Sequence, residues 1–212
     1  MSAVAQPYPH VSDGSTATEV KDEFRALLRA ARQARSARRR TDAADAFVDV
    51  VETIPALADA RCVAVYSARP TEPDTGPLLD SLAGRQIEVL LPVLGAGLQR
   101  EWARYAGRHD LLQRAPGRPP EPSTPSLGAE ALAEADVIIA PALAVDTTGT
   151  RLGQGGGWYD RALAHARPGT PVIALVFAEE LYDAEVRPLP REPHDRTVDI
   201  VATPERWYRL GA

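Results

Sequence analysis

Short apolar runs alternate with helix-forming segments along most of this chain, and the alternation limits the folds that it can adopt. Buried strands are expected at residues 62–66, 87–91, 137–140, 171–177 and 198–202. Helices are expected between them, at residues 42–54, 77–83 and 158–166. Such alternation is typical of a parallel sheet that is covered by helices. The sequence therefore predicts the α/β class.

The chain is expected to form a single domain over residues 19–212, because 212 residues suit one substantial core better than two small ones. Five prolines predict an extended loop over residues 115–126. A loop of this kind can link two domains, but each flank is too short for a separate core. Residues 98–105 are expected to add a strand, in which Trp102 either packs or lines a site.

The N-terminal part is predicted to change from a disordered tail to a helix. Residues 1–18 lack the basic and apolar segments of a signal peptide, so we expect them to be disordered. Apolar side chains at helical spacing then predict one long amphipathic helix over residues 19–39. Lys21, Arg25 and Arg29 share a neighbouring stripe of that helix. The stripe suits either a polyanion or solvent, and the sequence leaves both open.

Composition excludes several classes of protein. The net charge of −5 argues against a broad nucleic-acid surface, and no apolar stretch approaches the ~20 residues that span a bilayer. Cys62 is the only cysteine, so intrachain disulfides and thiolate zinc sites are excluded, and we expect a buried thiol. We expect a cytoplasmic monomer without nucleic-acid or membrane partners. Lys21 stands out as the only lysine beside 23 arginines.

The segment that indicates chemistry is the glycine-rich stretch from Asp146 to Arg161. It is predicted to join a strand to a helix, at the sheet edge where open α/β folds bind ligands. Glycines there allow backbone N–H groups to approach phosphate oxygens. The stretch does not match the common phosphate-binding and dinucleotide-binding patterns, because Trp158 stands where a third glycine would be. An anion-binding loop or a flexible surface loop remain the two interpretations of the residues alone.

The pattern Arg-Leu-Gly-x-Gly-x-Gly-aromatic-Tyr-Asp-Arg at residues 151–161 resembles the signature of the 5-formyltetrahydrofolate cyclo-ligase family, also called 5,10-methenyltetrahydrofolate synthetases. Other segments resemble the family in the same order along the chain: Lys21 with Arg25, residues 66–75, 91–93, 117–122, 140–146 and 193–195. The resemblance therefore extends over nearly the whole chain after the tail.

The resemblance implies a three-layer α/β/α fold with a mostly parallel sheet, and an ATP- and Mg²⁺-dependent ligase of folate one-carbon metabolism. In that reaction 5-formyltetrahydrofolate becomes 5,10-methenyltetrahydrofolate, with release of ADP and phosphate. The formyl oxygen first takes the γ-phosphoryl group, and N10 then closes the ring. The substrate can carry a polyglutamate tail.

The resemblance also assigns roles by matching position. It implies catalytic roles for Lys21, Arg151 and Tyr159, and Mg²⁺ coordination by Asp160 and Asp195. ATP-binding residues would be Lys21, Arg25, Arg151, Leu152, Gly153, Gln154, Gly155, Gly156, Gly157, Trp158 and Tyr159. Folate-binding residues would be Tyr66, Glu72, Gln154, Gly155, Gly156, Gly157 and Trp158.

Two positions depart from the family pattern. Trp158 replaces a frequent Tyr, which keeps a stacking face but exchanges a hydroxyl for an indole N–H. Gln154 and Gly156 stand where some members have Arg or Lys, so weaker binding of ATP or folate polyglutamate is expected. Alternatives to the cyclo-ligase are a non-catalytic nucleotide- or folate-binding paralogue and an enzyme of another class on a similar scaffold, such as a sugar-phosphate isomerase or a CoA transferase.

Overall fold

A seven-stranded, mostly parallel sheet forms the centre of the protein. The structure is a computed structural model that describes residues 6–9, 14–95, 97 and 99–211. The strands lie in the order β12 (Trp207–Arg209), β11 (Ile200–Ala202), β9 (Val172–Leu175), β6 (Val137–Pro141), β1 (Cys62–Val65), β2 (Glu88–Leu94) and β3 (Arg100–Arg104). The five inner strands are parallel, and only the edge strands β12 and β3 pair antiparallel. The predicted α/β class and its mostly parallel sheet are confirmed.

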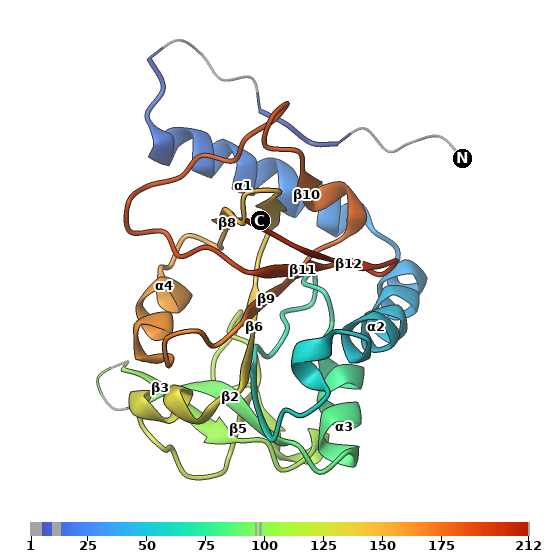
Figure 1. The fold of residues 1–212 in the computed structure, drawn as a ribbon, viewed down its shortest axis with the longest axis vertical. Coiled ribbons are helices and arrows are strands. Elements are labelled where there is room, and N and C mark those ends of the chain that lie inside the picture. Colours follow the sequence, from blue (N-terminus) through green and yellow to red (C-terminus); the bar gives the residue numbers. More distant parts are fainter. Residues whose placement is uncertain (1–5, 10–13, 96, 98, 212) are drawn as a thin grey trace.

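Helices cover both faces of this sheet (Figure 1). Helices α2 (Ala37–Glu52) and α3 (Gly76–Gly84) lie on one side, and α4 (Trp158–Ala162) lies on the other. Short 3₁₀ turns complete the connections: η1 (Pro55–Leu57), η3 (Arg108–Asp110), η4 (Ala129–Glu134), η5 (Leu163–His165) and η6 (Ala178–Glu180). The arrangement has the three layers expected from the resemblance.

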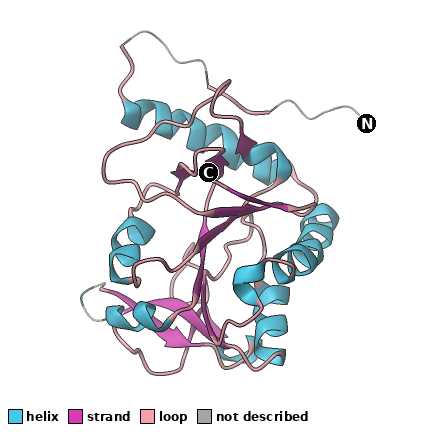
Figure 2. Ribbon diagram, in the orientation of Figure 1, coloured by secondary structure: helices cyan, strands magenta, loops and turns pink. Residues whose placement is uncertain are grey.

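Helix α1 (Ala17–Ala34) packs apart from these layers, on a second sheet (Figure 2). That sheet has three short strands in the order β10 (Leu181–Tyr182), β7 (Ala144–Asp146) and β8 (Arg151–Leu152). The cluster between helix and sheet is called the small core; it consists of Val20, Phe24, Leu28, Leu143, Ala144, Leu152, Tyr182 and Leu189. The main core is the larger buried cluster around the seven-stranded sheet. None of the three short strands was predicted.

The single helix expected over residues 19–39 is two helices. Thr16 and Glu19 form a capping box that starts α1 at Ala17. Arg35 is extended, with φ −71° and ψ 126°, and the Ser36 hydroxyl accepts a hydrogen bond from the Arg39 N–H as the N-cap of α2. The chain therefore turns at these two residues, so that α1 and α2 cover different sheets.

Part of the segment expected to be disordered packs against the domain. The ring of Tyr8 lies edge-on to Phe24, with centroids 4.9 Å apart. The Gln6 side-chain amide donates to the carbonyl of Leu181 at 2.8 Å. Residues 1–5 and 10–13, the rest of the expected tail up to the Gly14 turn, lie outside the described residues.

The proline-rich segment is extended as predicted, and it contains a two-residue strand. Strand β5 (Glu121–Pro122) pairs antiparallel with β4 (Leu111–Leu112), and it lies beside β2. Trp102 is 1% exposed, so it packs in the main core.

Cys62 is buried as expected, and burial is the main cause that raises the pKa of its thiol to about 12. Among the described residues, no helix combines the length and hydropathy needed to cross a bilayer.

Candidate active site

A cavity of about 600 Å³ lies between the main core and the α1 layer. All residues with predicted site roles line it: Lys21, Arg25, Tyr66, Glu72, Arg151, Leu152, Gly153, Gln154, Gly155, Gly156, Gly157, Trp158, Tyr159, Asp160 and Asp195. Sequence reasoning gave no site role to several other lining residues, among them Glu192, Arg118 and Glu121. The cavity therefore collects residues from α1, the segment after β1, β2, β5, the glycine loop and the segment before β11.

Lys21 forms the centre of the charged end of the cavity. Its Nζ donates to Glu192 Oε2 at 2.6 Å and to Asp195 Oδ2 at 2.5 Å, and the residue is only 5% exposed. Burial alone would raise the pKa of Asp195, but hydrogen bonds from Lys21 and from the Glu192 N–H, with the charge of Lys21, lower it overall. The lone lysine thus holds two carboxylates that lie 171 and 174 residues away in the sequence.

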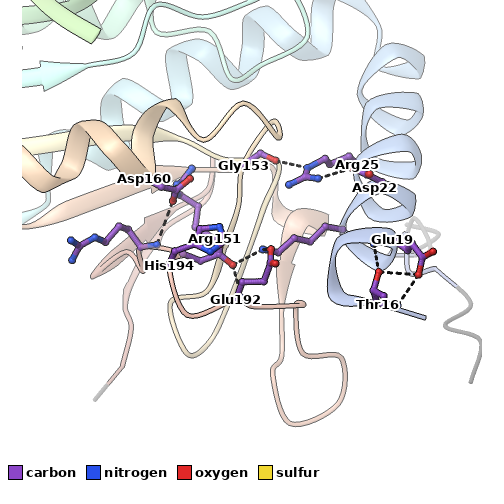
Figure 3. Close-up of polar contacts among 12 residues, drawn as sticks. Thr16, Glu19, Asp22, Arg25, Arg151, Gly153, Asp160, Glu192 and His194 are labelled. Carbon is purple, nitrogen blue, oxygen red and sulfur yellow. Dashed lines mark hydrogen bonds and ion pairs between the residues drawn. The ribbon is translucent and has the colours of Figure 1, made fainter. Parts of the chain in front are cut away.

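Arg151 and Asp160 form a second ion pair at this end (Figure 3). Arg151 Nη2 donates to Asp160 Oδ1 at 2.7 Å, and Nη1 donates to the carbonyl of Pro141 at 3.2 Å. The Arg151 side chain is 3% exposed, and its Nε has no partner among the described residues. Arg151, which is predicted to bind phosphate, and Asp160, which is predicted to bind the metal, are therefore paired with each other.

Residues 153–157 form the glycine loop, and arginine side chains donate hydrogen bonds to its carbonyl groups. Arg25 Nε donates to the carbonyl of Gly153 at 3.0 Å, as Figure 3 shows, and Arg29 Nη2 donates to that of Gln154 at 2.8 Å. The Lys21, Arg25 and Arg29 stripe therefore faces the cavity and its loop instead of solvent alone. Gly155 has φ +98°, so an L side chain would be strained there.

The elements that flank the loop differ from the prediction. The preceding strand is β8 of the three-stranded sheet, and residues 147–150 form the turn of the β7–β8 hairpin. The following helix, α4, has only five residues before η5 replaces it, where residues 158–166 were expected to form one helix. The N-terminus of so short a helix adds little positive charge, so binding of an anion by the loop would depend on its N–H groups and the nearby cations.

Aromatic side chains line the same cavity. The rings of Trp158 and Tyr159 lie 4.8 Å apart, and Trp102 packs edge-on against both from behind. Burial is the main cause that raises the pKa of Tyr66 and of Tyr159 well above the ordinary value, so both phenols keep their protons. The Tyr66 hydroxyl donates to the carbonyl of Pro73, whereas the Tyr159 hydroxyl has no partner in the described part of the chain.

Oxygen donors suited to a hard divalent cation lie at the charged end. Ligand atoms of Glu192, His194 and Asp195 all lie within 4.8 Å of one another, and carboxylates are the ligands that Mg²⁺ prefers. Asp160 lines the same cavity but is not part of that group. The donor set therefore fits Mg²⁺ through Asp195, and the joint role of Asp160 and Asp195 stays a prediction.

Comparison with known proteins shows the family of the chain. A sequence model described as the 5-formyltetrahydrofolate cyclo-ligase family matches residues 17–204. The chain belongs to that family. The resemblance noted in the sequence is thereby confirmed, and an unrelated enzyme class on a similar scaffold is excluded.

Several relatives of this cyclo-ligase family member cover most of its chain. A 5-formyltetrahydrofolate cyclo-ligase of Mycolicibacterium smegmatis is 44% identical over 151 residues, which are 69% of this chain and 75% of the relative. The cyclo-ligase of Escherichia coli K12 is 32% identical over 160 residues, which are 74% of this chain and 85% of the relative. Both carry the name of an enzyme, which supports the expectation that this chain is one.

Solved structures show the same architecture. An NMR structure of Aquifex aeolicus 5,10-methenyltetrahydrofolate synthetase superposes with a TM-score of 0.75 at 26% identity, covering 90% of this chain and 92% of that one. A synthetase from Mycoplasma pneumoniae superposes with a TM-score of 0.65 at 17% identity, covering 85% and 96%, and shares the fold.

Proposed function

We propose that the protein catalyses the ATP- and Mg²⁺-dependent conversion of 5-formyltetrahydrofolate to 5,10-methenyltetrahydrofolate, with release of ADP and phosphate. The observation that carries the proposal is one cavity that is lined both by the cations Lys21 and Arg151 and by the aromatic side chains of Tyr66 and Trp158. A nucleoside triphosphate suits the cations, and a flat reduced pterin suits the aromatic side chains.

The proposed reaction proceeds through a phosphorylated formyl group. The formyl oxygen attacks the γ-phosphorus, the bond to the β–γ bridging oxygen breaks, and ADP leaves. An N5-iminium phosphate remains, and N10 attacks its carbon and loses its proton to solvent. The C–O bond then breaks to release phosphate, which leaves the closed methenyl ring. An amide-like oxygen is a poor leaving group until it is phosphorylated, so ATP makes the closure favourable.

The side chains would act mainly by positioning and charge neutralisation, as is usual for phosphoryl transfer. Lys21, Arg25, Arg151 and the N–H groups of residues 153–157 would bind the phosphates. Lys21 and Arg151 are now paired with carboxylates, so binding the nucleotide requires those pairs to open or to share their donors. The Tyr159 hydroxyl stays protonated and has no partner among the described residues, so it can donate to a developing negative charge.

Magnesium bound at Asp195, with Asp160 or Glu192 as a second oxygen donor, would supply charge neutralisation of the triphosphate. The residues on the folate side would be Tyr66, Glu72 and Trp158, with the loop from Gln154 to Gly157. The Gln154 amide donates to Glu72 Oε1 at 2.8 Å, so this hydrogen bond connects the glycine loop with Glu72. We also propose that the enzyme is a cytoplasmic monomer that accepts 5-formyltetrahydrofolate with or without a polyglutamate tail.

The test is a direct assay of the methenyl product. Purified protein is incubated with 5-formyltetrahydrofolate, ATP and Mg²⁺, and the near-ultraviolet absorbance of the product is followed. We expect product only when ATP is present. Equal rates without ATP contradict the proposal, whereas ATP binding without any turnover supports the non-catalytic paralogue.

A further inference from the structure

Two carboxylates line the cavity away from the Lys21 cluster, and they differ in what they already bind. Both oxygens of Glu72 are occupied: Oε1 accepts from the Gln154 amide at 2.8 Å and Oε2 accepts from the Arg69 N–H at 2.9 Å. Glu121 has one partner among the described residues, Arg114 Nε, at 3.5 Å from its Oε2. The Arg114 side chain is 52% exposed, whereas that of Glu121 is 6% exposed.

A buried carboxylate with so little compensation is costly unless something else donates to it. Each carboxylate oxygen can accept about two hydrogen bonds, so the described residues leave most of the accepting capacity of Glu121 unused. Because the residue lines the cavity, a ligand in the cavity is the natural source of donors. A ligand with two adjacent N–H donors would match the two oxygens of this carboxylate.

The backbone holds Glu121 in a fixed place. The residue lies on β5 between Pro120 and Pro122, opposite Leu112 of β4. Prolines restrict φ on either side, so little backbone entropy is lost when a ligand binds. A rigid acceptor of this kind favours bidentate recognition.

Strand β5, which carries Glu121, also lies far from helix α1. In Figure 1, β5 lies at the far end of the molecule from α1, which carries Lys21, and α4 lies between them. Pro92, Val93 and Pro119 line the cavity together with Glu121 and supply apolar walls for a flat ring.

We infer that Glu121 is a specificity-determining residue that binds the 2-amino and N3–H groups of the reduced pterin. The inference rests on the proposed function and names the residue that orients its substrate. These two donors lie side by side on the pyrimidine edge, at the end of the fused rings opposite C6 and its N10-bearing side chain. Binding them at Glu121 therefore directs the reacting N5-formyl group and N10 toward the glycine loop and Lys21.

The experiment compares two ligands by calorimetry in the absence of ATP. The ligands are 5-formyltetrahydrofolate and its 2-desamino analogue, which lacks one of the two donors. We expect Glu121→Gln to raise the Kd of the natural substrate about ten- to a hundredfold, because a charge-assisted acceptor pair is lost and an amide N–H₂ faces a donor. The Kd of the analogue should change much less, so the discrimination between the two ligands should largely disappear.

A matched control is Glu88→Gln, the same chemical change at a half-exposed β2 residue that pairs with Arg104 and does not line the cavity. It should leave both Kd values within about twofold. If Glu121→Gln does not fold, Glu121→Asp keeps the charge, withdraws the carboxylate by one methylene and should still reduce the discrimination.

Two outcomes overturn the inference alone: discrimination that persists in the Glu121 variants, or equal weakening of both ligands, which would indicate a structural role. Wild-type protein that binds no 5-formyltetrahydrofolate, with or without ATP, overturns the proposed function instead.

Discussion

The main core and the small core stabilise the two walls of one cavity very differently. The main core buries 41 of the described residues around the seven-stranded sheet, and the small core buries 8 between α1 and three short strands. The wall proposed to hold the pterin belongs to the first, and α1, with the side chains proposed to bind phosphate, belongs to the second. Local stability follows the density of buried apolar contacts, so the wall proposed to hold ATP should open at lower free energy than the wall proposed to hold folate.

Polar contacts compensate in part for the thin packing of α1. Arg32 is 1% exposed and donates to both Glu180 oxygens, at 2.7 and 2.8 Å, and to the carbonyl of Ala142 at 2.7 Å. Removing one partner of such a buried pair leaves an uncompensated charge. A few specific contacts therefore hold α1 in place, whereas many contacts hold the main sheet.

The largest expected effect comes from removing one phenylalanine from each core. Phe24 and Phe47 are both fully buried, and replacing either with Ala should lower the free energy of unfolding by roughly 3–5 kcal/mol. Phe24→Ala should also accelerate hydrogen exchange of the α1 amides well before those of β6 and raise the Kd of ATP. Phe47→Ala should leave ATP binding to folded protein unchanged. Equal loss of protection of the α1 and β6 amides in both variants would show that the two cores unfold as one cooperative unit.

Lys21→Met tests the charged contact that α1 supplies. Loss of one charge-assisted hydrogen bond is worth about 1.5–3 kcal/mol, which corresponds to a roughly ten- to hundredfold effect on ATP. Steady-state kinetics distinguish two cases. Loss of a contact that is equally strong in the ground and transition states raises KM for ATP, whereas loss of a contact that strengthens during phosphoryl transfer lowers kcat. Lys21→Arg should rescue only partly, because the planar fork places its donors differently. Unaltered constants for ATP would leave Arg25 and Arg151 as the cations to test.

Asp160→Asn and Asp195→Asn test one proposed metal ligand on each wall, because Asp160 lies on α4 of the main layers and Asp195 lies against α1. An amide is a neutral ligand, so each variant should need a higher Mg²⁺ concentration for half-maximal rate, by roughly three- to tenfold, since phosphate oxygens and water supply the remaining ligands. Mg²⁺ titrations of the initial rate measure the shift. An unchanged Mg²⁺ concentration for half-maximal rate in both variants would show that neither residue is a metal ligand.

The smallest effect is expected at Asp136, which ties β1 to β6 at the edge far from the cavity. Its carboxylate accepts from the N–H groups of Arg61 and Cys62 and from Arg167 Nη2. The hydrogen bond from the Arg61 N–H is the main cause that lowers the pKa of Asp136 below its ordinary value of 3.8.

A lowered pKa in the folded state stabilises the protein above pH ~4, and this contribution is lost as the pH falls further. Asp136→Asn should therefore cost about 1 kcal/mol at pH 7 and less below pH ~4, while ATP binding stays unchanged. Urea unfolding at pH 7 and pH 3.5 measures the difference. An equal cost at both pH values would contradict the assignment.

The five inner strands of the main sheet could be predicted because each contains a buried apolar run bounded by turn residues, as Val137 to Ala140 illustrates. The edge strand β12 was not predicted, because its three residues are partly or fully exposed and form no apolar run. Strands β7, β8 and β10 have two or three residues each, too few for any period to appear. The break between α1 and α2 was hidden by strong helix formers on both sides of Ser36, although a serine N-cap was the available signal.

The candidate site was predictable where a local motif carries it, as at Arg151 to Arg161. It was not predictable where contacts join distant segments. Nothing in the spacing of the sequence pairs Lys21 with Glu192, and only its neighbours His194 and Asp195 indicate that Glu192 matters. Glu121 lay within a segment whose prolines indicated a loop, and its burial depends on how β5 packs beside β2.

On the ribosome, α1 leaves the exit tunnel long before the groups that locate it. Arg32 and Lys21 bind residues synthesised 148 and 171 positions later. At typical rates of roughly 5–20 residues per second, the helix waits about 8–30 s for these partners. Parallel strands of the main sheet can pair during that interval, whereas the cationic side of the cavity closes only when nearly all of the chain has been made. Nascent chains that stall before residue 180 would therefore carry a largely formed sheet and an undocked, amphipathic helix that chaperones can bind.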